Sequence, residues 1–113
     1  MNIIVSVKRK ELVFFKDKDN VFGTLKLYDK DMKRYFYVIK DKLKNTRPGA
    51  KIYFYMYGHI KYYAIIDSIT FNLFDNSMIV YFDKLLIFKK YNEQFYKVKK
   101  FYGARYYDDI INL

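Results

Sequence analysis

Short apolar runs, rich in β-branched and aromatic residues, recur along the chain between polar turns, and this pattern predicts strands. The run at 51–57 (KIYFYMY) is almost continuously apolar, as expected for a strand buried on both faces. Gly58–His59 and Asp75–Ser77 are typical of turns, and they separate this run and the next from their neighbours. Strands are expected over residues 2–8, 11–15, 51–57, 61–70, 78–82, 85–88 and 95–98.

One segment has helical spacing instead. Its apolar residues recur at i, i+3, i+4, i+7 and i+11, which predicts a helix over 31–44. These residues are Met32, Tyr35, Phe36, Ile39 and Leu43. The Pro48–Gly49 pair follows as a break, and 108–113 predicts a terminal helical turn. The expected fold class is therefore α+β: a single domain over 1–113, with a mixed sheet curled into a small pseudo-barrel and one or two short helices.

The amino-acid composition excludes several kinds of functional site. A chain of 113 residues suffices for one domain, and the absence of Cys excludes a disulfide framework, a thiol nucleophile and Cys-ligated zinc. A single His excludes a multi-histidine metal site. No apolar stretch approaches the roughly 20 residues of a membrane span, and residues 1–10 do not resemble a secretory leader. We expect a cytoplasmic protein with no membrane partner, no metal and no cofactor.

The charge points to an anionic partner. The chain carries 22 Lys and Arg against 12 Asp and Glu, a formal charge of +10, together with 14 Tyr and 11 Phe. Glu occurs only at Glu11 and Glu93, so the excess is more than Lys enrichment. Cations with many aromatics favour nucleic-acid or nucleotide binding. The alternative is that the charge keeps a very aromatic domain in solution.

The sequence contains no pattern that clearly indicates a catalytic site. His59 falls at a predicted turn, and the Asp108–Asp109 pair is better explained by capping of the terminal turn than by a magnesium site. The four glycines are isolated, so the chain has no Gly-rich phosphate loop, and no Ser lies in a nucleophile-elbow motif. We expect no catalytic residues and no enzymatic activity.

The segment 97–107 (KVKKFYGARYY) suits binding better. It interleaves cations with aromatic residues around Gly103, and cations hold phosphates while aromatic faces stack on bases. The predicted phosphate-binding residues are Lys97, Lys99 and Lys100. Tyr102 is a predicted stacking residue. An equally weighted alternative is a closing strand with buried aromatics and solvated lysines.

The order of these features resembles the PUA-like superfamily, especially its EVE and ASCH branches. The resemblance rests on a first strand at 3–8, an aromatic-glycine loop at 21–24 (VFGT), and the segment 47–55 (RPGAKIYFY). It extends to the paired strand at 62–69 and the ending 102–110 (YGARYYDDI). It implies a pseudo-barrel with a concave pocket between the first strand, the aromatic-glycine loop and the C-terminal segment.

Relatives in that superfamily bind RNA or modified nucleobases in this pocket. The positions that the resemblance assigns to it are Ser6, Phe22, Gly23, Tyr55, Gly103 and Arg105.

The leading hypothesis is a non-enzymatic nucleic-acid-binding module that recognises RNA or a modified nucleobase, with DNA left open. One alternative is a protein-interaction domain, for example a homodimer burying Tyr106 and Tyr107. The other is an ASCH-like small hydrolase or nuclease, which would need an acid or Lys beside the pocket, such as Asp67 or Lys8.

Overall fold

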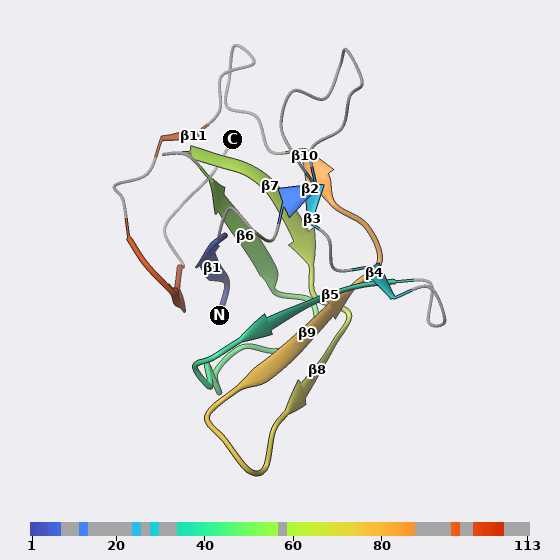
Figure 1. Cartoon of the computed structure of the whole chain (residues 1–113), viewed down its shortest axis with the longest axis vertical. Helices are drawn as coiled ribbons and strands as arrows, with labels where there is room; N and C mark the ends of the chain where they lie inside the picture. Colours follow the sequence, from blue (N-terminus) through green and yellow to red (C-terminus); the bar gives the residue numbers. More distant parts are fainter. Residues whose placement is uncertain are drawn as a thin grey trace.

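The computed structural model describes residues 1–7, 12–13, 24–25, 28–29, 34–56, 59–87, 96–97 and 101–107. Every regular element in these residues is a β-strand, and the strands form two main sheets (Figure 1). The first sheet has the order β10 (Leu86–Ile87), β7 (His59–Ile65), β6 (Lys51–Met56), β1 (Ile3–Ser6) and β12 (Ala104–Tyr106), and β11 (Tyr96–Lys97) also pairs with β7. The second has the order β4 (Tyr28–Asp29), β5 (Arg34–Ile39), β9 (Met78–Phe82) and β8 (Ser68–Phe71). A short ladder joins β2 (Leu12–Val13) to β3 (Thr24–Leu25).

Strand β1 is the link between the two ends of the chain. It pairs in parallel with β6 and antiparallel with β12, so the N-terminal strand lies between a central and a C-terminal strand. Its residues Ile3, Ile4 and Val5 are all buried, as a strand with apolar residues on both faces requires. The predicted strand at 51–57 is confirmed as β6, and that at 78–82 as β9.

The helix predicted over 31–44 is wrong. Residues 34–39 form β5, which pairs with β9 along five consecutive residues, and 40–47 is irregular or turn. The apolar residues also fit a period of two, since Tyr35, Tyr37 and Ile39 face the core while Val38 is half-exposed. Aromatic and β-branched residues favour strands, and a helix would have placed Tyr37 and Val38 on its polar face.

The predicted α+β class and the predicted pseudo-barrel are also wrong. In the described part of the chain there is no helix, and the two main sheets stay open rather than closing into a barrel. The strand predicted over 61–70 is divided: β7 ends at Ile65, and β8 begins at Ser68 in the other sheet. The terminal turn predicted at 108–113 lies outside the described residues.

Aromatic rings hold the two sheets together. The ring centroids of Phe54 in β6 and Phe82 in β9 lie 5.5 Å apart, and the ring of Tyr37 meets Phe54 edge-on at 5.6 Å. Tyr35 stacks on Phe82 at 5.5 Å. Buried residues of both sheets complete this core: Ile3, Val5, Ile39, Leu43, Ile52, Tyr62, Ala64, Ile66, Met78 and Val80.

Thr46 is the one buried polar residue among the described positions, and no described group accepts or donates a hydrogen bond at its hydroxyl. Burying an unpaired hydroxyl costs about 1–3 kcal/mol. Thr46→Val keeps the shape and removes this cost, so we expect the free energy of unfolding to rise by about 1 kcal/mol in urea titrations. A loss of stability of similar size would show that the hydroxyl is paired.

A second apolar cluster covers the opposite face of the first sheet. Ile4, Tyr53, Tyr55 and Ile60 form it, and further aromatics pack against it. Burial raises the pKa of Tyr53, with the neighbouring Tyr63 and Tyr107 adding to the shift. In the other cluster, burial also raises the pKa of Tyr62.

These raised pKa values predict a loss of stability in alkali. The folded protein holds the two phenolic protons more tightly than the unfolded chain does. Their contribution is therefore full below about pH 10, the ordinary tyrosine value, and is lost as the pH rises above it. Urea unfolding at increasing pH should show this decline, and it should be less steep in Tyr53→Phe and Tyr62→Phe. If stability declined as steeply with pH in both variants as in the wild type, Tyr53 and Tyr62 would not be the groups responsible.

Candidate functional site

A groove opens where β1, β12 and the end of β5 meet. It has a volume of about 330 Å³. We call its buried lining residues, Val5, Tyr37 and Ile39, the floor, and its exposed ones, which include Lys40, Asp41 and Tyr102, the rim. The lining residues are Val5, Ser6, Tyr37, Val38, Ile39, Lys40, Asp41, Tyr102, Gly103 and Ala104.

Gly103 shapes one side of the groove. Its φ is +77°, in the left-handed region that favours glycine. The Gly103 carbonyl accepts a hydrogen bond of 2.8 Å from the Ser6 amide, which fixes the turn into β12 against the end of β1. A Cβ on Gly103 would lie 4.0 Å from a carboxylate oxygen of Asp41, so the acid faces this turn across the groove.

Tyr102 presents a large aromatic surface at the rim. Its side chain is 81% exposed, although it precedes the turn that closes the sheet. Val38, which also lines the groove, is half-exposed. An exposed ring next to an apolar floor can stack on a flat ligand and remove both surfaces from water.

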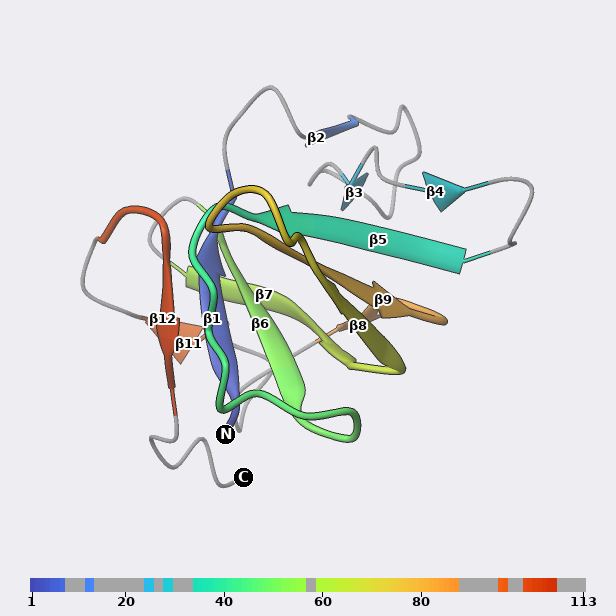
Figure 2. The same ribbon diagram turned by 90° about the horizontal axis from the view of Figure 1, so that it is seen from below.

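A cationic loop continues from the groove. Residues 40–47 carry four cations and one acid, Asp41; the cations are Lys40, Lys42, Lys44 and Arg47. The loop runs back along β1 toward the N-terminus (Figure 2). It is anchored there, because the Met1 ammonium donates to the Asn45 carbonyl at 3.0 Å and the Asn45 amide donates to the Tyr106 hydroxyl at 2.9 Å. Of these cations, Lys40 lines the groove itself, and the Arg47 guanidinium donates to the carbonyls of Lys44 and Thr46 within the loop.

The structure brings some of the predicted site residues together. Ser6, Tyr102 and Gly103 line the groove. Tyr55 and Arg105 lie apart from it, since both contact Phe101: Tyr55 with a centroid distance of 5.0 Å and Arg105 with its guanidinium 4.6 Å from the ring centroid. Alternation explains the split, because neighbouring residues of a strand point to opposite faces, and Ala104 faces the core.

Other predicted site residues are described less fully or not at all. Lys97 belongs to β11, opposite His59 in the register with β7. His59 thus lies in a strand rather than in the predicted turn. The remaining predicted site residues, Phe22, Gly23, Lys99 and Lys100, lie outside the described residues, as do Lys8, Asp108 and Asp109.

Sequence reasoning missed the contribution of Val38, Lys40 and Asp41. Lys40, Lys42 and Lys44 fall within the helix predicted over 31–44, where they would sit in its last turns and favour its C-terminal end. Reading 34–39 as a strand ending at a cationic turn would have placed them at a sheet edge.

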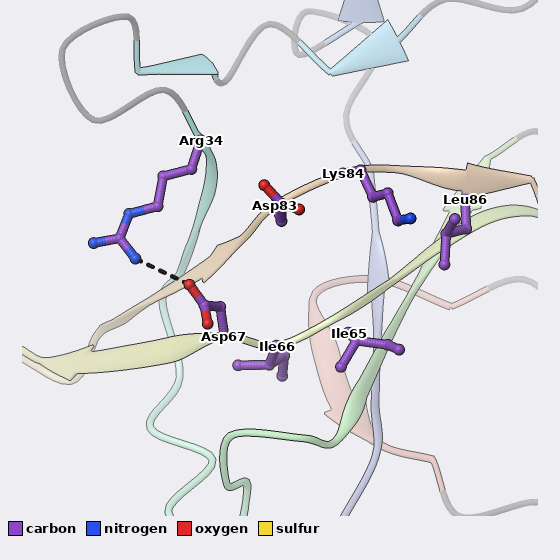
Figure 3. Close-up of a pocket in the computed structure, with 7 residues that line it drawn as sticks. All are labelled: Arg34, Ile65, Ile66, Asp67, Asp83, Lys84 and Leu86. Carbon is purple, nitrogen blue, oxygen red and sulfur yellow. Dashed lines mark hydrogen bonds and ion pairs between the residues drawn. The ribbon is translucent and has the colours of Figure 1, made fainter.

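A larger open cleft, of about 660 Å³, lies where β7, β8 and the end of β9 approach Arg34 (Figure 3). Arg34 is already engaged: it donates to Asp67 at 3.2 Å and to Ser68 at 3.3 Å, and its guanidinium lies 4.8 Å from the ring centroid of Tyr81. The other charged lining residues, Asp83 and Lys84, are of opposite sign. The lining charges of this cleft therefore balance, which makes it a poorer phosphate site than the groove.

Residues named above for the hydrolase and the homodimer alternatives make contacts within the chain. Asp67, the acid named for a hydrolase, is the ion-pair partner of Arg34. Tyr106 accepts the hydrogen bond from Asn45, and the ring of Tyr107 packs against Tyr53 with a centroid distance of 5.9 Å.

Two features typical of other functional classes are absent from the described residues. In that part of the chain, no three or more acidic or His side chains gather closely enough to hold a metal ion. No helix there is long and apolar enough to cross a membrane. Comparison with protein-family models, curated proteins and solved structures gives no match for this chain.

Proposed function

We propose that the protein is a non-enzymatic module that binds single-stranded nucleic acid. The observation that carries the proposal is an exposed aromatic ring, Tyr102, at the rim of an apolar groove that continues into the cationic loop 40–47. A base stacks on Tyr102, and its phosphates lie along the lysines of the loop. This combination of stacking platform and cationic track is how proteins bind single strands.

The groove suits an unpaired base. In a duplex the base faces are stacked on each other, so a ring at the rim could reach them only in a single strand. The carboxylate of Asp41 and the hydroxyl of Ser6 can accept hydrogen bonds from base amino or imino groups. The overall charge of +10 attracts the phosphate chain from a distance.

Fluorescence anisotropy with labelled oligonucleotides tests the proposal. Single-stranded RNA, single-stranded DNA and the corresponding duplex are titrated with the full chain at several salt concentrations. We expect single strands to bind more tightly than the duplex, with affinity falling as salt increases. The RNA and DNA arms decide which of the two is preferred. Absence of binding at low salt to every probe would overturn the proposal.

Tyr102→Ala should weaken binding to single strands by about 5- to 150-fold, because a base–aromatic stack is worth about 1–3 kcal/mol. Tyr102→Phe keeps the ring and should bind nearly as well as the wild type. Phe74→Ala is the control, since it removes another largely exposed ring, in the β8–β9 turn, that is not part of the groove lining. Equal effects of Tyr102→Ala and Phe74→Ala would argue against a stacking site in the groove.

A further inference from the structure

The β8–β9 hairpin differs in charge from the rest of the protein. None of the 22 Lys and Arg residues falls within 62–83, which contains three acids, Asp67, Asp75 and Asp83. The hairpin forms the lower end of the molecule in Figure 1. Arg34 of β5 lies against the base of the hairpin but is paired with Asp67, and the sequence of the stretch adds only acids, so the hairpin is a poor site for a phosphate chain.

Strand β8 has an open edge. It is the last strand of its sheet, and in the described part of the chain only β9 pairs with it. Edge strands are usually protected by Lys, Pro or a bulge, but the sequence of β8 is SITF and its register with β9 is regular.

The direction of the free hydrogen-bonding groups follows from the hairpin. The Asn72 amide donates to the Ser77 carbonyl at 3.1 Å, so it faces β9. Hydrogen-bonding direction alternates along an antiparallel strand. Within β8, the amides and carbonyls of Ile69 and Phe71 therefore point to the outer edge, where an added strand can pair with them. The Asp67 amide, which donates to the Tyr81 carbonyl at 2.8 Å, precedes the strand and stands outside this alternation.

The tip next to this edge is strongly apolar. Leu73 is 88% exposed and Phe74 is 97% exposed, and Phe71 at the end of β8 is exposed as well. The Phe74 amide donates to the Asn72 side-chain oxygen at 2.8 Å, which holds the turn that carries them. Adjacent, exposed apolar side chains of this size are typical of interaction sites.

We infer that β8 is a docking edge for an extended, basic segment of another protein, which adds to the sheet as a strand next to β8. Lys or Arg residues of that segment are attracted by Asp75 at the exposed tip, because Asp67 is already paired with Arg34, and its apolar residues cover Leu73 and Phe74. A second copy of this chain is disfavoured, because pairing β8 to β8 brings two acidic hairpins together on two molecules that each carry +10.

The test uses the full chain and two labelled peptides, one of alternating Lys and Val and one of alternating Glu and Val. The Lys–Val peptide should bind in an anisotropy titration, and hydrogen exchange should slow at the amides of Ile69 and Phe71. The Glu–Val peptide should not produce that protection, although the positive net charge of the protein attracts an acidic peptide. Failure of the Lys–Val peptide to bind, or protection elsewhere than β8, would overturn the inference.

Variants separate backbone pairing from side-chain loss. Phe71→Pro removes an outward amide, and Phe71→Val removes the ring but keeps the amide, so the proline variant should bind on the order of ten-fold more weakly than the valine variant. Asp75→Lys, at the exposed tip, should weaken binding without touching β8. Equal affinities of all three variants and the wild type would contradict the proposal. A concentration-dependent dimer in sedimentation that Phe71→Pro abolishes would assign the edge to a second copy instead.

Discussion

Replacing Phe82 by alanine is expected to lower the free energy of unfolding by about 3–5 kcal/mol. Phe82 is fully buried, its ring lies 5.5 Å from Phe54 of the opposite sheet, and Tyr35 stacks on it. The substitution therefore removes apolar contacts and leaves a cavity where the two sheets meet. Since domains of this size are stable by only about 5–15 kcal/mol, Phe82→Ala should unfold at much lower urea concentration than the wild type.

The matched control is Phe74→Ala. It removes the same side chain from a position that is 97% exposed, so its effect should stay within about 0.5 kcal/mol. Phe82→Leu fills part of the cavity and should fall between the two. A loss at Phe82 no larger than at Phe74 would mean that the two sheets do not share this core.

Replacing Lys40, Lys42 and Lys44 together by alanine should weaken binding strongly and make it less dependent on salt. Each cation that contacts a phosphate of a single strand contributes about 0.7 to the slope of log affinity against log salt. The triple variant should thus lower that slope by about 2 and weaken binding at 0.1 M salt on the order of 100-fold. Anisotropy titrations over a range of salt concentrations measure both quantities.

Lys84→Ala controls for the loss of positive charge alone. Lys84 is exposed but lies in the cleft where the lining charges balance. Its removal should leave the slope almost unchanged, and stability measurements on the triple variant should stay close to the wild type because Lys40 and Lys44 are exposed and Lys42 is only half-buried. An unchanged slope in the triple variant would exclude loop 40–47 as the phosphate track.

The local pattern of apolar and polar residues was enough to predict strands β6 and β9. β6 is apolar on both faces and β9 follows a clear polar turn, so neither depends on distant partners for its identification. β5 could not be predicted in this way, because its apolar residues fit both a helix and a strand. Pairing with β9, which is far away in sequence, decides between the two.

The candidate site was predicted in part for a similar reason. Ser6 and Gly103 were both expected beside a pocket, and the pairing of β1 with β12 does bring them together. Tyr55 and Arg105 were expected in the same pocket, but the sequence does not reveal to which face of a buried strand each residue points. Lys40 and Asp41 line the groove because they follow directly after β5. Predicting their position would have required identifying 34–39 as a strand.

An NMR titration of the isotope-labelled full chain with a short single-stranded oligonucleotide tests whether the groove and loop 40–47 bind nucleic acid. If they do, the amide signals of Ser6, Gly103 and Ala104 and those of residues 38–44 shift as the oligonucleotide is added, while the signals of the 72–77 turn stay unchanged. Signals that shift mainly in the 72–77 turn, or no shifts at low salt, would contradict the proposed function.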